Sequence, residues 1–215
     1  MKFHWELNDG PYRFKKNINY VIYFKGCFAP PHIGHFSAIS DIVLNNPNVK
    51  VIINQVVKSE RRHGVPYEIN KKIWQLYIDN LLPKNRVDLH KYQKLDKYIN
   101  HPFMKDADKV IYLRANENFD IDLVEKRFVK YHKKIIKKFN SKGIDVAYYA
   151  QERNATVISA TKFIEQLIKY KETGEDYYKL RQFIPEKLPL EIFHQIINMI
   201  LSCNIKNKLI VLYDV

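Results

Sequence analysis

Glycine, proline and histidine residues are concentrated in one ten-residue stretch, Gly26–His35, which reads Gly-Cys-Phe-Ala-Pro-Pro-His-Ile-Gly-His. It follows the apolar run Tyr20–Phe24, whose β-branched and aromatic residues predict a buried strand. The first glycine lets the backbone turn close to a ligand, and Gly34 leaves room beside the start of the next helix. His32 and His35 lie at that helix start, where both can face one anion together with the unpaired helix N–H groups. The stretch therefore predicts an anion-binding loop.

Two nearby histidines are equally compatible with ordinary surface residues or with a helix cap. A zinc site would need further ligands, and none is spaced convincingly in the sequence, so no metal ligand is predicted. The two cysteines, Cys27 and Cys203, lie far apart and form neither a disulfide framework nor a zinc motif. A reducing compartment is therefore the default expectation.

The loop resembles the signature G-x-F-x-P-x-H-x-G-H of a nucleotidyltransferase superfamily. This superfamily includes the nicotinamide-mononucleotide, phosphopantetheine and FMN adenylyltransferases and the phospholipid-pathway cytidylyltransferases. All six specified positions of the signature are met, by Gly26, Phe28, Pro30, His32, Gly34 and His35. The resemblance implies that the two histidines are catalytic and stabilise charge that develops on the triphosphate. It also implies nucleotide binding by Gly26, Cys27, Phe28, Ala29 and Gly34.

A second motif of the superfamily, I-S-[ST]-T-x-x-R, is partly present near residue 160. The resemblance implies that this helix start holds the β- and γ-phosphates, through Ile158, Ser159, Ala160, Thr161 and Lys162. From the residues alone, Ser159 and Thr161 are equally an ordinary pair at a helix N-cap. Ile164 occupies the position of the final arginine. Lys162 could supply a cation instead, but its direction on the helix differs from that position by about 200°. Nucleotide binding without turnover is therefore an alternative.

Two further basic positions follow predicted strands. Lys58, Arg61 and Arg62 come after the second strand, where relatives place a basic residue against the acceptor phosphate, although a solvated basic loop is an equal alternative. Arg114 follows the fourth strand in the sequence Leu-Arg-Ala. This short segment is similar to one in phosphopantetheine adenylyltransferases in which the arginine contacts ATP.

The resemblance also implies a reaction without a covalent enzyme intermediate. An acceptor phosphate attacks the α-phosphorus of a nucleoside triphosphate, and pyrophosphate leaves, with Mg²⁺ carried mainly by the nucleotide phosphates. Cytidylyltransferases typically show R-T-x-G-x-S-T before the last helix, and Gln151–Ser159 lacks that glycine and the threonine after arginine. AMP transfer from ATP is therefore favoured, with nicotinamide mononucleotide as the leading acceptor and phosphopantetheine and FMN next. A CTP-dependent cytidylyltransferase acting on a phosphorylated alcohol is the alternative.

The amino-acid composition limits the classes of protein to which the chain can belong. The 215 residues are 46% hydrophobic and 27% charged, which indicates a globular chain, and the net charge of +13 favours anionic partners. A nucleic-acid-binding protein that stacks bases on its Tyr and Phe residues is the rival from another class, but Lys and Tyr are scattered and no nucleic-acid motif appears. No apolar run approaches the ~20 residues of a membrane span, and residues 1–16 lack a signal-peptide core. A cytoplasmic protein without membrane contact is expected, and a homo-oligomer stays open.

Strand and helix patterns alternate along the chain. The elements that they predict must position the candidate site residues. Strands are predicted over residues 20–24, 49–57, 87–90, 110–113 and 144–150. Helices are predicted over residues 35–45, 66–82, 123–140, 158–171 and 189–203. The alternation predicts an α/β, Rossmann-like, doubly wound parallel five-stranded sheet with a C-terminal helical extension. The expected organisation is an N-terminal arm (1–17), a nucleotidyltransferase domain (18–172) and a helical extension of the same domain (173–215). Ligands of such sheets bind beyond the carboxyl ends of the strands, where the candidate residues lie.

Overall fold

The computed structural model describes residues 14–56, 63–116, 121–152 and 158–205. They fall into two compact units that alternate along the chain. The first, here called the sheet unit, holds the described residues of Met1–Gly26, Asp41–Asn54 and Asn85–Arg153. The second, here called the loop unit, holds those of Cys27–Ser40, Gln55–Lys84 and Asn154–Val215. The predicted boundaries after residues 17 and 172 remain predictions, and residues 1–13 of the predicted arm lie outside the described part.

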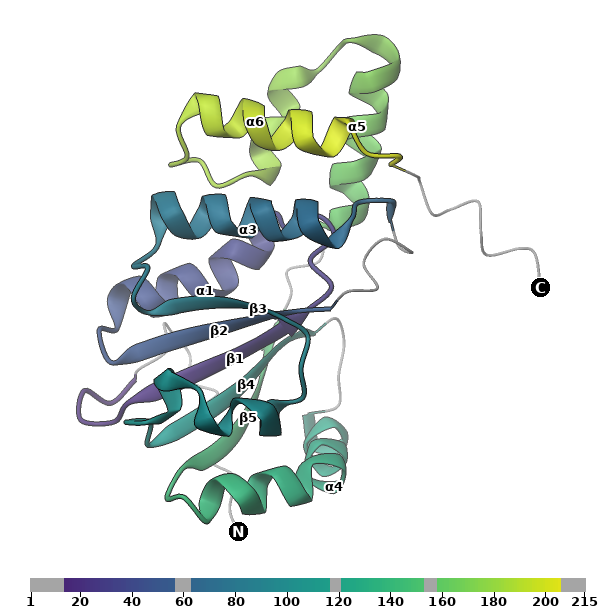
Figure 1. Cartoon of the computed structure of the whole chain (residues 1–215). Coiled ribbons are helices and arrows are strands. Elements are labelled where there is room, and N and C mark those ends of the chain that lie inside the picture. Colours follow the sequence, from purple (N-terminus) through teal and green to yellow (C-terminus); the bar gives the residue numbers. More distant parts are fainter. Residues whose placement is uncertain (1–13, 57–62, 117–120, 153–157, 206–215) are drawn as a thin grey trace, which may run out of the picture. The chain divides into compact units, whose positions relative to one another are not determined.

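Five strands form one sheet in the order β3-β2-β1-β4-β5 (Figure 1). They are β1 (Tyr20–Gly26), β2 (Val49–Gln55), β3 (Val87–Lys91), β4 (Lys109–Asn116) and β5 (Asp145–Glu152). β4 pairs in parallel with both β1 and β5, so that Lys109 stands opposite Tyr20 on one side and Asp145 on the other. The central strand β1 is apolar along most of its length and nearly all buried, as a strand covered on both faces requires. The predicted Rossmann-like α/β fold, with a parallel five-stranded sheet and flanking helices, is confirmed.

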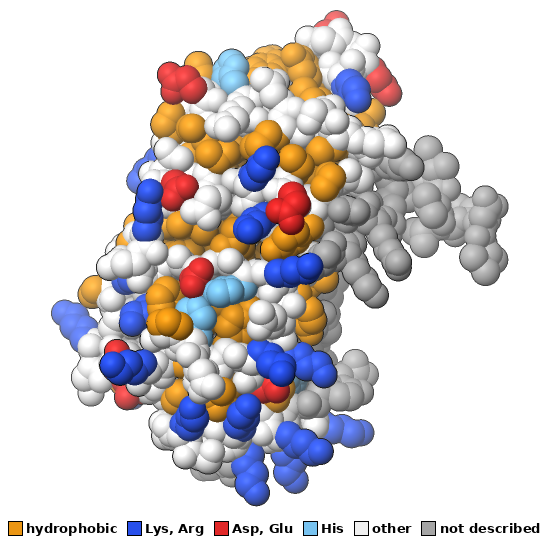
Figure 2. Space-filling view, in the orientation of Figure 1, with side chains coloured by type: hydrophobic (Ala, Val, Ile, Leu, Met, Phe, Trp, Pro, Cys, Tyr) orange, Lys and Arg blue, Asp and Glu red, His pale blue; other side chains and the backbone are white. Residues whose placement is uncertain are grey.

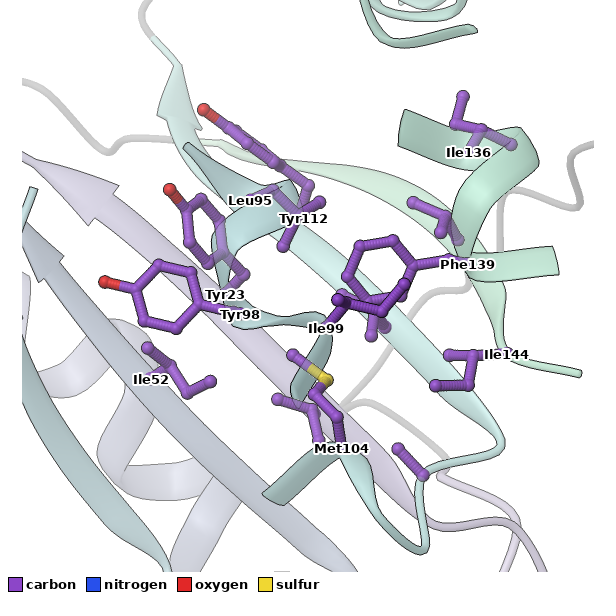
Figure 3. Close-up of a cluster of buried hydrophobic side chains, with 14 of the residues drawn as sticks. Tyr23, Ile52, Leu95, Tyr98, Ile99, Met104, Tyr112, Ile136, Phe139 and Ile144 are labelled. Atoms are coloured by element: carbon purple, nitrogen blue, oxygen red, sulfur yellow. The ribbon is translucent and has the colours of Figure 1, made fainter. Parts of the chain in front are cut away.

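One hydrophobic core lies within the sheet unit (Figure 3). The sheet contributes Tyr23, Ile52 and Tyr112, and the helix α4 (Ile121–Asn140) contributes Ile136 and Phe139. Two short 3₁₀-helices complete the cluster, η2 (Leu95–Asn100) and η3 (Pro102–Met104). The sequence did not predict these two helices, because segments this short show no periodicity of their own and form by burying residues such as Leu95 and Met104.

A buried amide ties the end of β2 to the segment after β3. Asn54 donates through Nδ2 to the Gln93 carbonyl at 2.7 Å and contacts the Tyr23 hydroxyl, and its Oδ1 accepts from the Tyr98 hydroxyl at 3.1 Å. The Tyr23 hydroxyl in turn donates to the Gln93 carbonyl at 2.7 Å. A buried polar group without a hydrogen-bond partner costs free energy, so these groups favour the arrangement in which all of them are paired. The network therefore sets the position of η2 on the sheet.

The helix α4 is amphipathic in its described second half. Ile136 and Phe139 are buried, while the exposed side carries Lys130, Lys133, Lys134, Lys137 and Lys138. This spacing of apolar positions places them on one helix face and leaves the lysines on the other. Figure 2 shows Lys and Arg side chains spread over the visible face of the molecule among apolar and uncharged groups.

The loop unit is helical. It holds the first part of α1 (Ile33–Asn45) together with α3 (Tyr67–Leu81), α5 (Ala160–Thr173), η4 (Tyr177–Phe183) and α6 (Leu190–Leu201). α3 packs against α6, and α5 packs against η4, where the rings of Phe163 and Phe183 stack at 4.9 Å. Among the described residues, none of the helices combines the length and apolar character that a bilayer crossing requires.

Helix ends differ from the predicted ones where a neighbouring residue acts as a cap. The prediction that Ile158 opens a helix is wrong, because Ser159 is the N-cap and the helix α5 begins at Ala160. Likewise α1 begins at Ile33 and not at His35, and α6 ends at Leu201, two residues before the predicted end. Caps depend on backbone angles that a hydrophobic pattern does not specify.

Asp176 links the end of α5 to η4 and makes the stability of the loop unit depend on pH. Its carboxylate accepts from Lys169 Nζ at 2.6 Å and from Lys179 Nζ at 2.9 Å. The hydrogen bond from Lys169, followed by that from Lys179, lowers the pKa of Asp176 in the folded chain. A lowered folded-state pKa stabilises the fold above the ordinary aspartate pKa, and that contribution is lost as the pH falls through the folded value.

We therefore expect Asp176→Asn to lower the melting temperature by about 1–3 °C at pH 7 and by less at pH 3. Asn tolerates the left-handed backbone at this position (φ 65°) as Asp does, so the change removes charge alone. Thermal melts at the two pH values measure the difference, with Glu175→Gln as the matched control. Equal shifts at both pH values would contradict the expectation.

Candidate active site

The loop from Cys27 to His35 is held by aromatic packing within the loop unit. The Phe28 ring meets the His35 ring edge-on at 5.0 Å and the Trp74 ring of α3 at 5.3 Å. Phe28 has φ 44°, in the left-handed region that a bulky residue seldom adopts. Such backbone strain persists only where the surroundings hold it, and it concentrates at functional loops.

Backbone hydrogen bonds determine which ring nitrogen of each histidine carries the proton. The Gly34 N–H donates to His32 Nδ1 at 3.1 Å, and the His32 N–H donates to His35 Nδ1 at 3.4 Å. A nitrogen that accepts a hydrogen bond is unprotonated, so the neutral form of each ring carries its hydrogen on Nε2. The ring centres lie 3.8 Å apart with a tilt of 34°. The pair thus supplies two N–H donors without needing a positive charge.

Gly34 brings the two sequence motifs together within the loop unit. A Cβ added at Gly34 would lie 3.0 Å from His32 Cε1 and 3.9 Å from the carbonyl oxygen of Ile158. The segment that leads into α5 therefore passes beside Gly34, the residue against which the His32 ring also lies. Ser159 caps that helix, its Oγ accepting from the Lys162 N–H at 3.2 Å. The first-turn N–H groups of a helix have no partner inside the helix, and they make its N-terminus attractive to anions.

Ser159 is the N-cap of α5, as one interpretation of the sequence predicted, and its role in phosphate binding stays a prediction. Thr161 follows in the first turn, half-buried, and Lys162 is exposed. Ile164 is fully buried beside Phe163 and Leu167, so the position of the family's arginine belongs to the core of the loop unit. The side chain at that helix position therefore supplies no cation.

Some of the remaining predicted site residues lie in the described part of the chain, and others do not. Gly26 is the last residue of β1, and Cys27 is a half-buried free thiol, followed by the buried Ala29. Arg114 lies on β4 opposite Ala150, with its side chain outside the described part. The two predicted acceptor-binding residues, Lys58 and Arg61, lie outside the described part of the chain. Among the described residues, the structure brings the two motifs close to each other at Gly34.

Trp74 and Tyr77 of α3 support the loop, and the sequence did not single them out. The Tyr77 hydroxyl donates to the Pro31 carbonyl at 3.2 Å, and burial raises the pKa of Tyr77. Both side chains are fully buried, and their rings meet edge-on at 5.8 Å. Their burial agrees with the apolar periodicity of α3, but no local sequence signal relates the helix to a loop some 45 residues earlier, as the contact of Tyr77 with Pro31 does.

Solved structures with a similar fold include a nicotinic acid mononucleotide adenylyltransferase. The nicotinic acid mononucleotide adenylyltransferase of Plasmodium falciparum, complexed with NaAD, aligns with a TM-score of 0.51 and 13% identity over 82% of this chain and 95% of its own. The same enzyme complexed with APC aligns with a TM-score of 0.51 and 13% identity over 84% and 98% of the two chains. No protein-family model matches the sequence, and neither does a curated protein.

This similarity defines the class of fold to which the chain belongs. The chain shares the Rossmann-like fold of these two solved adenylyltransferase structures, which is the fold that its resemblance to the loop signature implied. At 13% identity the agreement extends to the fold and not to the substrate.

Proposed function

We propose that the protein is an adenylyltransferase that moves AMP from ATP onto a phosphorylated small acceptor, such as nicotinamide mononucleotide, and releases pyrophosphate. The observation that carries the proposal is the histidine pair, whose two Nε2–H donors are set by backbone hydrogen bonds beside the segment leading into α5. Fixed donors of this kind stabilise charge that develops in a transition state without needing to reorganise.

The proposed reaction is a direct displacement at the α-phosphorus of ATP. An oxygen of the acceptor phosphate forms the new P–O bond while the bond to the pyrophosphate oxygen breaks, and Mg²⁺ arrives with the nucleotide as part of the substrate. His32 and His35 donate hydrogen bonds to phosphate oxygens as their charge grows. The first turn of α5 binds the departing pyrophosphate through its N–H groups.

Pyrophosphate release is the direct test of this proposal. ATP and CTP, each with Mg²⁺, are crossed with nicotinamide mononucleotide, nicotinate mononucleotide, phosphopantetheine, FMN and phosphorylated alcohols. A productive pair with ATP supports the proposal and names the acceptor, whereas turnover with CTP alone supports a cytidylyltransferase. No turnover with any pair, while ATP still raises the melting temperature, would support a nucleotide-binding protein that lacks turnover, consistent with the buried Ile164.

Binding to nucleic acid is less well supported by the described residues. The exposed lysines of α4 could contact phosphates, but the aromatic residues beside them in the core, Phe139, Tyr112 and Tyr148, are buried. Stacking of bases needs exposed rings. Adding single-stranded DNA or RNA to the same melting experiment tests this alternative.

Gly34→Ala is expected to separate activity from stability. The added methyl group would lie 3.0 Å from His32 Cε1 and 3.2 Å from His32 Nδ1, so the ring must shift and lose its set position. The ring need move by only a few tenths of an ångström. Because a displacement of about 1 Å at a reacting group costs on the order of 10² in rate, we expect a cost of roughly 10-fold or less. Alanine is also the better helix former, by up to about 1 kcal/mol, which offsets part of the strain.

We therefore expect a moderate fall in kcat, roughly 10-fold or less, with little change in melting temperature. The exposed Ser37, on the same helix, provides the matched control Ser37→Ala, which should leave both quantities unchanged. Unchanged turnover in Gly34→Ala would show that the position of the His32 ring does not matter for the reaction.

A further inference from the structure

Three metal-ligating side chains converge in the sheet unit. Asp88 and His90 alternate along β3 and therefore point to the same face of that strand. His101 directly precedes η3. His90 Nε2 and His101 Nε2 lie 3.2 Å apart, and each lies 3.1 Å from the same oxygen, Asp88 Oδ2. Two ring nitrogens and one carboxylate oxygen thus form a nearly equilateral triangle.

We propose that Asp88, His90 and His101 form a binding site for a divalent transition metal ion, with Zn²⁺ as the reference ion. Zinc binds His nitrogen and carboxylate oxygen at about 2.0–2.2 Å in a tetrahedron, whose edges are then about 3.3 Å long. The three observed separations, 3.1, 3.1 and 3.2 Å, are close to this edge. A single ion placed above the triangle reaches all three atoms.

The surrounding residues hold the triangle in place. The Tyr98 ring packs edge-on against the His90 ring at 5.3 Å and lies 6.0 Å from the His101 ring. Tyr98 is itself buried and held through its hydroxyl by Asn54. His101 is mostly buried, with 9% of its side chain exposed, and the Phe103 ring meets it edge-on at 4.9 Å. Two of the three ligands are therefore positioned before any ion arrives.

The site is open on one side. The side chains of His90 and Asp88 are 30% and 45% exposed, so a fourth position can be filled by water or by a ligand from solution. Three protein ligands with an open fourth position are typical of reactive zinc sites, whereas structural zinc sites are closed by four. Nitrogen ligands also distinguish this site from one for Mg²⁺, which prefers oxygen.

The charge state of the cluster is compatible with a cation. Partial burial is the largest effect on His101 and lowers its pKa, which favours the neutral ring. Partial burial alone would raise the pKa of Asp88. The interactions with His90 and His101 outweigh this effect, so the pKa of Asp88 lies below its ordinary value. The ionised Asp88 and the neutral His101 that these shifts favour are the forms in which carboxylates and imidazoles bind metals.

Metal binding has one structural consequence that can be measured. His101 Nδ1 accepts from the Phe103 N–H at 3.1 Å, so the neutral ring carries its proton on Nε2. Coordination through Nε2 moves that proton to Nδ1, and the hydrogen bond from Phe103 is then lost. The ion is thus expected to change the environment of the Phe103 amide while it links β3 to η3.

The test uses the full chain, freed of metal with a chelator, and titrates it with Co²⁺ and Zn²⁺. We expect one tight site per chain, a visible Co²⁺ absorption band typical of low coordination number, and displacement of Co²⁺ by Zn²⁺ but not by excess Mg²⁺. His90→Gln and Asp88→Asn should each weaken the affinity by at least about 100-fold, since even outer partners of a ligand are worth 10–100-fold. The exposed His194 of α6 gives the control His194→Gln, which should bind as the unchanged chain does.

A second readout does not depend on any variant. In the unchanged chain labelled with ¹⁵N, Zn²⁺ should shift the ring nitrogens of His90 and His101 and the Phe103 amide. The proposal is overturned if no saturable one-to-one binding occurs. It is equally overturned if binding survives both substitutions, or if the shifts appear at other histidines, such as His32 and His35.

Discussion

Replacement of His35 by alanine is expected to lower kcat for pyrophosphate release by about 10²–10³-fold, the usual cost of removing a fixed transition-state donor. The structure gives the reason. The His35 ring receives the His32 N–H at Nδ1, lies 3.8 Å from the His32 ring and packs against Phe28, so its Nε2–H has one set direction. Alanine removes that donor.

The fall should appear mainly in kcat, because the donor acts on charge that develops during the reaction and not on the bound ground state. Rates with saturating ATP and acceptor measure it, and ATP-induced stabilisation measures the binding that remains. His35→Gln, which keeps a polar side chain of similar length, guards against a folding defect. His194→Gln on α6 serves as the histidine control.

Removing His32 as well should cost little beyond the loss of His35 alone, because residues that act as a unit have strongly non-additive effects. Near-normal turnover of His35→Ala with an unchanged melting temperature would exclude the proposed role of the pair. A fall in rate that tracks a fall in stability in both His35 variants would instead assign the residue a structural role.

Trp74→Ala is expected to be the most destabilising single change in the loop unit. Trp74 is fully buried and packs against Phe28 and Tyr77. Truncation of a buried aromatic side chain costs about 3–5 kcal/mol, because the transfer free energy is lost and a cavity remains. Set against a total stability of about 5–15 kcal/mol, that is a large fraction.

Trp74→Phe separates packing from polarity at the same position. The indole Nε1 is buried and has no hydrogen-bond partner among the described residues, so phenylalanine gives up volume but no hydrogen bond. We expect it to cost clearly less than alanine and to keep the contact with Phe28. Urea unfolding of both variants gives the free energies of unfolding, and pyrophosphate release shows whether the loss of Phe28 support reaches the histidines. Equal costs for the two variants would contradict a packing role.

The amino-acid sequence by itself determined the class of fold and the strand–loop–helix segment that carries the predicted anion-binding residues. The run Tyr20–Phe24 and the glycines, prolines and histidines that follow it predicted a strand, a turn and a helix start, and all three are present. These features are local, since backbone freedom and apolar periodicity are encoded within a few residues. The match to the nucleotidyltransferase signature is likewise a property of one contiguous stretch.

Other features were decided only by the tertiary structure, because they depend on residues far apart in the chain. The passage of Ile158 beside Gly34, the support of Phe28 by Trp74 and the burial of Ile164 each join segments that no local pattern relates. The same holds for His101, which is ten or more residues from Asp88 and His90 and meets them only because η2 folds back onto the sheet. Packing of the core sets these distances, and the chemistry of the site depends on them.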